Sequence, residues 1–168
     1  MQETPVMGRS FVSTVPLHIA NGMLSDGHYL GPIGAARHIH GMCLHGSIVA
    51  VMVWRWPTAR MIPSDGTWLE LSRWLLTPEA GKNAGSWMMA RAVRWIRAHF
   101  PRVRVLVSYS DPGHGHTGAL YRACNWKSAP THHELRWRTN GVGYPSGHGS
   151  WGGEHQHPKQ RWTYEVAA

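Results

Sequence analysis

The sequence is poor in charge, in acidic residues and in cysteine. Charged residues make up 15% of its 168 positions, against about 25% in an average soluble domain. This low content excludes a coiled coil and a charge-rich disordered chain. No apolar run reaches the roughly 18 residues of a membrane span, and the first residues lack the long apolar segment of a secretory signal. We therefore expect a globular protein of the cytoplasm that does not enter a membrane.

The two cysteines, Cys43 and Cys124, are too few for a disulfide framework and predict reduced thiols. Positive charge, by contrast, is in excess, because 17 Lys and Arg against 9 Asp and Glu give a formal net charge of +8. Such an excess favours a polyanionic partner, with nucleic acid ahead of a phosphorylated cofactor. The competing interpretation is that the excess positive charge serves only to keep the protein soluble.

The hydrophobic pattern predicts one α+β domain over residues 1–168. Strands are expected at residues 11–15 (or a lead-in), 35–44, 47–56, 68–76, 102–111, 134–138 and 161–166. Helices are expected at 83–99 and at 117–124, the second with Thr117 as its N-cap. Residues 16–34 predict an ordered loop with a short helical stretch at 18–24, and residues 139–160 a loop rich in Gly, His and Trp.

The segment from Leu76 to Ser86 runs from a predicted strand into a predicted helix. Unpaired N–H groups at a helix start, together with Lys82, form a site suited to a pyrophosphate. Gly85 would let the backbone approach such a ligand closely. An ordinary strand-to-helix turn is the alternative, and the pattern does not separate the two.

Polar residues mark the exit of a predicted central strand, at Ser108, Tyr109, Ser110 and Asp111, where binding sites are often built. Turn formation by Asp111 is the alternative. On the following helix, Tyr121 has a phenol that could protonate a leaving thiolate, because its pKa exceeds that of a thiol. A half-buried packing role is the alternative for this tyrosine.

Several blocks of the sequence resemble the Mom family of phage DNA-modification proteins, within the GNAT-like acyltransferase superfamily. They are HYLG at 28–31, LELSRWLL at 69–76, GKNAGS at 81–86 and LVSYSDPGHGHTGALYRACNW at 106–126, less than half of the chain. The resemblance implies a GNAT-like, mostly antiparallel sheet that is flanked by helices and splayed at its central strands. It also implies modification of adenine N6 to a carbamoylmethyl-type base that shields DNA from restriction nucleases. Acyl-CoA use and an iron requirement are associated with the family.

The resemblance also assigns site residues. The cofactor's pyrophosphate turn would fall on Leu76, Lys82, Asn83, Gly85 and Ser86, although GKNAGS departs from the usual GNAT pattern Arg/Gln-x-x-Gly-x-Gly/Ala. The catalytic groups would fall on His28, Tyr29, Glu70, Ser72, Ser108, Tyr109, Ser110, Asp111 and Tyr121. The period of two in the strand at 68–76 predicts Glu70 and Ser72 on one face, with Leu69, Leu71 and Arg73 on the other.

A double-stranded DNA substrate suits the composition. The target base must leave its stack, which costs a few kcal/mol, and aromatic surfaces return about 1–3 kcal/mol per stacked base. The candidates for stacking are Trp54, Trp56, Trp68 and Trp151, of which most are expected in the core. Phosphate contacts are expected from Arg55, Arg60, Arg73, His114 and His116, and the stripe of Arg91, Arg94 and Arg97 predicts a solvated helix face.

Histidines offer candidate metal ligands at His28, His38 and His40, with Asp111 or Glu70 as a carboxylate partner. Their spacing matches no zinc pattern. Two other functions remain open at this point: an acyl-CoA-dependent N-acyltransferase acting on a protein or small amine, and a DNA-binding module without catalysis. The oligomeric state is open too, with a dimer among the alternatives.

Overall fold

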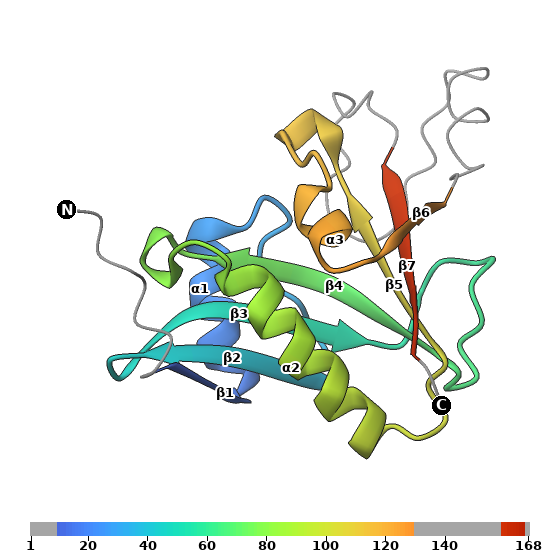
Figure 1. Cartoon of the computed structure of the whole chain (residues 1–168), viewed down its shortest axis with the longest axis horizontal. Coiled ribbons are helices and arrows are strands. Elements are labelled where there is room, and N and C mark those ends of the chain that lie inside the picture. The colour runs from blue at the N-terminus through green and yellow to red at the C-terminus, as the bar shows by residue number, and fades with distance from the viewer. Residues whose placement is uncertain (1–9, 130–158, 167–168) are drawn as a thin grey trace.

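The computed structural model describes residues 10–129 and 159–166 (Figure 1). Its strands are β1 (Ser10–Thr14), β2 (His38–Leu44), β3 (Ser47–Arg55), β4 (Trp68–Leu76), β5 (Val105–Ser110), β6 (Lys127–Ala129) and β7 (Gln160–Glu165). Its helices are α1 (Leu17–Gly27), α2 (Ala84–His99) and α3 (Ala119–Ala123), with short 3-10 turns η2 (Pro78–Ala80) and η3 (Pro112–His114). No helix in these two ranges is long and apolar enough to cross a membrane.

All seven strands form one sheet in the order β1-β2-β3-β4-β5-β7-β6. Strands β4 and β5 are parallel, and the other neighbouring pairs are antiparallel. A parallel pair needs a crossover connection, which α2 supplies here. The expected mixed, mostly antiparallel sheet flanked by helices is therefore confirmed.

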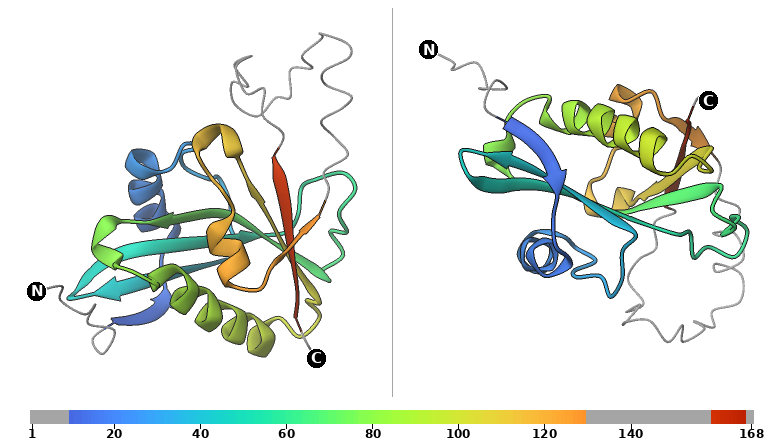
Figure 2. Two further views of the ribbon diagram at one scale, coloured as in Figure 1. Left: turned by 45° about the horizontal axis from the view of Figure 1, so that its top comes forward. Right: turned by 90° about the horizontal axis from the view of Figure 1, so that it is seen from below.

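The helices divide between the two faces of the sheet (Figure 2), with α2 and α3 on one side and α1 on the other. We call these the α2 face and the α1 face. Under α2, Met88, Met89 and Ile96 recur at helical spacing and bury against the sheet in the larger apolar cluster. Under α1, Ala20 and Leu24 do the same in a smaller cluster. Both faces of the central strands are therefore buried.

Strands β4 and β5 part halfway along their length. They pair only from Trp68 with Val105 to Leu71 with Ser108. Beyond that point β4 continues beside β3, while β5 continues beside β7, and Figure 1 shows the two strands diverging. The predicted splay therefore lies after Leu71 and Ser108, and it opens between the carboxyl ends of two parallel strands, where ligands commonly bind.

A bulge in β4 changes which side chains share a face. The β3–β4 register shifts so that Trp54 pairs with Leu71 and Val53 with Arg73, which makes Ser72 the extra residue. The Ser72 hydroxyl donates to the Val53 carbonyl at 3.1 Å. The predicted alternation is therefore wrong beyond Leu71, because the extra residue brings Arg73 onto the α1 face with Glu70.

Other differences from the predicted elements are local. Helix α1 is longer than the expected 18–24 because Ala20 and Leu24 bury its inner side against the sheet. Thr117 is not the N-cap of α3; Gly118 holds that position at φ 74°, where a Cβ would collide with Trp162. The short strand β6 has no counterpart in the sequence prediction. The strand expected at 134–138 and the loop up to residue 158 lie outside the described residues, and Gln160 belongs to β7.

Candidate active site at the strand splay

The hydroxyls of Ser108 and Tyr121 meet where β4 and β5 part. Their oxygens are 2.8 Å apart, and Ser108 also donates to the Leu71 carbonyl at 2.8 Å. Because a serine hydroxyl has a single proton, Tyr121 must be the donor in the bond between the two hydroxyls. Burial raises the pKa of Tyr121 to about 12. The splay therefore holds a neutral phenol whose proton is directed along a fixed chain.

Aromatic rings hold this phenol in place. The Tyr121 ring stacks on Trp162 with centroids 5.4 Å apart, and Trp74 approaches it edge-on at 5.7 Å. Trp162 is itself fixed, because its Nε1 donates to the hydroxyl of Ser110 at 2.8 Å. Ser110 thus positions Trp162, and through it Tyr121.

On the α1 face, Glu70 is buried and ion-paired. Its Oε1 accepts from Arg55 Nη2 at 2.6 Å and Nε at 3.1 Å, and its Oε2 lies 3.4 Å from the backbone nitrogen of Thr58. Arg55, predicted to contact phosphate, is thus largely occupied by this carboxylate. Tyr109 lies on the same face, and burial followed by the charge of Glu70 raises its pKa.

Asp111 is only 2% exposed, directly follows β5 at the splay and is the N-cap of η3. Its Oδ1 accepts from the backbone nitrogen of Gly113 at 2.9 Å, and its Oδ2 lies 3.3 Å from His114 Nδ1. The turn-forming role and a role in the site are therefore compatible. Tyr29 stacks on His114 with centroids 4.0 Å apart. Burial, followed by the Asp111 charge, raises the pKa of Tyr29 to about 12.

Three blocks distant in sequence thus meet at the splay. Arg73 donates from Nε to the Gly31 carbonyl at 3.1 Å, which ties β4 to the segment after α1. In that segment, burial and the neighbouring Arg73, His116 and His114 lower the pKa of His28 to about 4. His28 is therefore neutral at neutral pH. Arg60 lies exposed in the loop between β3 and β4.

The turn before α2 has the features expected of a pyrophosphate site. Asn83 occupies the N-cap in the left-handed conformation, at φ 64°, without a side-chain cap bond, and no acidic residue lies in the first turn. Lys82 and Asn83 are exposed, and the Ser86 hydroxyl donates to the Asn83 carbonyl. The residues present therefore fit the diphosphate of a CoA cofactor.

Gly85 has a packing role that the sequence did not predict. A Cβ at this position would lie 2.6 Å from a terminal carbon of Leu120 and 3.3 Å from one of Leu76. Gly85 thus lets α2 pack against α3 and the end of β4. Leu76, at the end of β4, takes part in that packing and so supports the turn that precedes α2.

The candidate metal ligands do not converge. His38 and His40 lie against α2, where His38 stacks on Trp95 at 3.7 Å and His40 accepts from Trp54 Nε1 at 3.0 Å. His28 belongs to the segment after α1, on the other face. Among residues 10–129 and 159–166, no three His, Cys, Asp or Glu side chains gather closely enough to hold a metal ion. An iron centre does not fit the described arrangement, and we derive no step through one.

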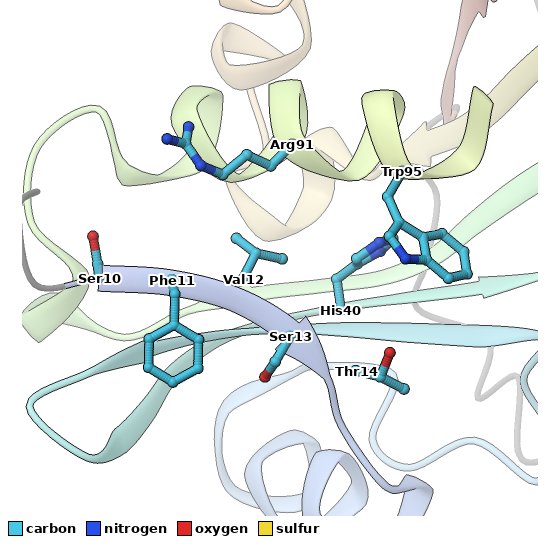
Figure 3. A pocket seen from close by; sticks show the side chains of 8 residues that line it. All are labelled: Ser10, Phe11, Val12, Ser13, Thr14, His40, Arg91 and Trp95. Carbon is cyan, nitrogen blue, oxygen red and sulfur yellow. The ribbon is translucent and has the colours of Figure 1, made fainter. Parts of the chain in front are cut away.

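A cavity of about 320 Å³ lies away from the splay, between α2 and the edge strand β1 (Figure 3). His40 and Trp95 line one end of it and Arg91 the other. The expected stacking role of Trp54 is wrong, since that side chain is 0% exposed in the core. Trp56 and Trp68 are half-buried, and Trp151 lies outside the described residues.

Sequence reasoning missed two basic residues at the splay, Lys159 and Arg161. Lys159 fell within a stretch predicted as a loop, and Arg161 in a strand to which no function was assigned. The alternation in RWTYEV contained a usable signal, because a buried Trp162 places Arg161 on the opposite face of the sheet.

A model of the Mom protein family matches residues 9–163. The chain belongs to the Mom protein family. No protein with curated annotation matches it by sequence.

Solved structures place this Mom protein in the GNAT acetyltransferase fold. The ribosomal-protein-S18-alanine N-acetyltransferase of Escherichia coli superposes with a TM-score of 0.64 at 11% identity, covering 95% of each chain. A GNAT-family acetyltransferase of Streptococcus pneumoniae gives 0.63 at 10% identity, covering 94% of this chain and 99% of the other. The yncA protein of Salmonella typhimurium, solved with its cofactor acetyl-CoA, gives 0.62 at 9% identity and 95% coverage of each.

Proposed function

We propose that this Mom family protein is a transferase that acylates adenine N6 in double-stranded DNA and thereby protects the DNA from restriction. The carbamoylmethyl-type base implied by the family resemblance bonds N6 to a methylene carbon, so acyl transfer alone does not form it. Acyl-CoA is the proposed donor. The observation that carries the proposal is the Tyr121–Ser108 pair at the parting of β4 and β5, with Asp111 buried at the end of the same strand. Membership of the Mom family, whose resemblance implies modification of phage DNA, supports DNA as the substrate.

Acyl-CoA would be held at its diphosphate by Lys82 and the uncapped first turn of α2. When bound, the cofactor supplies an acyl group on a thioester and leaves as a thiolate. A pKa of about 12 makes complete proton transfer from Tyr121 to a thiolate unfavourable, since thiols titrate near about 8.5. We therefore assign Tyr121 a hydrogen bond to the leaving sulfur, which it reaches by releasing Ser108.

The acceptor side of the site is the α1 face. An exocyclic adenine amine is a poor nucleophile, so close positioning and exclusion of water must contribute strongly. The buried carboxylate of Asp111, adjacent to His114, can accept a hydrogen bond from that amine and take up the proton that it loses. The base reaches this depth only after leaving its stack.

The decisive experiment is expression in bacteria followed by mass spectrometry of nucleosides from total DNA. Wild-type protein should give a modified adenosine, and plasmid from the same cells should resist an adenine-sensitive nuclease. Tyr121→Phe, which removes the donor to the leaving group, should lower the modified fraction at least about tenfold. Tyr164→Phe is the matched control, because it removes a hydroxyl from another half-buried tyrosine of the same cluster.

Unmodified adenosine and a plasmid that is fully cut, from folded wild-type protein, contradict the proposal. Transfer from acetyl-CoA to a peptide or small amine without DNA, insensitive to salt, would instead support the N-acyltransferase alternative.

A further inference from the structure

Charged side chains cross the α1 face in a row over neighbouring strands. The β3–β4 register pairs Arg55 with Glu70, and the β5–β7 register pairs Tyr109 with Arg161. The two pairs are adjacent, because Glu70 is opposite Val107, two residues before Tyr109 on β5. Arg161 therefore projects beside the splay, on the face where the acceptor would bind.

The row contains more positive than negative charge. Arg55 is matched by Glu70 at 2.6 Å. Arg73, Lys159 and Arg161 lie on the same face, and Asp111 is the other buried carboxylate there among the described residues. Lys159 directly precedes β7, and Arg161 is the second residue of that strand. The charges of Asp111, Arg73 and Glu70 all act on the Lys159 ammonium, so it lies on the same face.

Bringing these positive charges together on one face is unfavourable for the free energy of the folded protein. Burial lowers the pKa of Arg73, and the charge of Arg55 lowers it further. Burial also lowers the pKa of Lys159, with Arg73 acting in the same direction against the opposing effect of Asp111. Half-buried like charges repel, and an anion bound among them would offset that repulsion.

The three arginines differ in what their Nε atoms contact. Nε of Arg55 donates to Glu70 at 3.1 Å, and Nε of Arg73 donates to the Gly31 carbonyl at 3.1 Å. Nε of Arg161 is buried and has no hydrogen-bond partner among the described residues. A buried charged donor without an acceptor is costly. Of the buried atoms without a partner in the described part of the chain, Nε of Arg161 is the one that belongs to a permanent cation. Within residues 10–129 and 159–166, Arg161 thus lacks the oxygen acceptor that Arg55 and Arg73 have at this atom.

We infer that Arg161, with Lys159 beside it, forms a phosphate-binding site on the α1 face, and that a DNA phosphodiester next to the target base occupies it. The assignment to DNA rests on the proposed function. A guanidinium presents its N–H groups as a planar fork that matches two phosphate oxygens, and an ammonium adds a flexible point charge. The phosphates of CoA are the other source of the same chemistry, and the turn before α2 already offers a place for them.

The test compares two substitutions that remove the same charge from different faces. Arg161→Gln removes the proposed phosphate ligand, and Arg94→Gln removes an exposed arginine from α2. Binding of a short DNA duplex is measured by fluorescence anisotropy over a range of salt concentrations, with CoA binding measured by calorimetry. Arg161→Gln should weaken duplex binding about tenfold and reduce the salt slope by about 0.9. Arg94→Gln should change both by less than about twofold, and Arg161→Lys should fall between.

Each outcome decides the inference. Equal loss in the two glutamine variants overturns it, because only net charge would then matter. Loss of CoA binding with duplex binding intact overturns the assignment to DNA. Selective loss of duplex binding in folded Arg161→Gln supports the site, even if wild-type protein leaves adenine unmodified, and in that case only the proposed function fails. Thermal unfolding of each variant checks that the fold persists.

Discussion

The α2 face and the α1 face of the sheet differ in which side chains are buried at the splay. On the α2 face, apolar side chains fill the space under the helix, and a hydrogen-bonded chain runs from Tyr121 through Ser108 to Leu71. The atoms without a partner in the described ranges that lie beside Tyr121, Nε1 of Trp74 and Nε1 of Trp126, are uncharged.

On the α1 face at the splay, buried or half-buried charges gather around Glu70 and Asp111, and Nε of Arg161 has no acceptor among the residues that the structure describes. The difference indicates that the α2 face fixes the fold and the position of Tyr121, and it supports the proposal that the α1 face binds a charged ligand.

Asp111→Asn should give the largest effect, on activity alone. Asparagine can still accept the Gly113 N–H that shapes the turn, but it cannot take a proton. We expect a loss of about 10²- to 10⁴-fold in adenine modification, the usual range for general acid–base catalysis, with little change in thermal stability. Asp26→Asn, in exposed α1, is the control. Full activity in Asp111→Asn would remove the carboxylate from the mechanism.

Met88→Ala should show the opposite profile, with stability lost and chemistry kept. Met88 is 0% exposed under α2, and truncation of such a side chain costs about 2–5 kcal/mol in free energy of unfolding. Denaturant unfolding measures that loss, and activity per folded molecule should stay near the wild-type value. Met61→Ala, at a side chain 79% exposed, should be close to neutral. A loss of activity per folded molecule in Met88→Ala would contradict the prediction that Met88 contributes to stability and not to the chemistry.

Acid should weaken the α2 face by a smaller amount. Burial lowers the pKa of His40 to about 3 and that of His38 to about 4, below the value of about 6.5 in an unfolded chain. As pH falls below about 6.5, the unfolded chain binds protons that the folded protein excludes, so the free energy of unfolding decreases toward pH 4. His40→Gln, whose amide oxygen can still accept from Trp54, should flatten this dependence. His45→Gln, at an exposed histidine, is the control. If the free energy of unfolding depends on pH equally in His40→Gln and His45→Gln, the predicted role of His40 is contradicted.

Much of the fold was accessible from the sequence because its signals are local. The period of Met88, Met89 and Ile96 predicts α2, and the polar exit after a buried strand predicts the grouping of Ser108 and Asp111. Tyr121 could be predicted as well, since the helix that carries it follows that strand within a short loop.

Contacts set by register or by long connections were not accessible. The bulge at Ser72 breaks the period of two, so no alternation rule could place Arg73 beside Glu70. Arg161 reaches the site only because β7 inserts between β5 and β6, and its neighbour Trp162 meets Ser110 across 52 positions of sequence. Nothing local in the sequence specifies that insertion.

The extra residue in β4, Ser72, shifts the alternation of side chains between the two faces by one position from Arg73 onward. It lets Leu71 and Trp74, three positions apart, point the same way, so the first half of the strand lines the core and the second half reaches the phenol. Forcing Ser72 into regular pairing would exchange the directions of the two residues that follow it, turning Trp74 toward the cations and Arg73 toward the aromatic rings, whereas deleting Ser72 would leave both directions unchanged. The spacing along β4, as much as the identity of any side chain, therefore keeps the aromatic rings around Tyr121 and the cations around Arg73 on separate sides of the sheet.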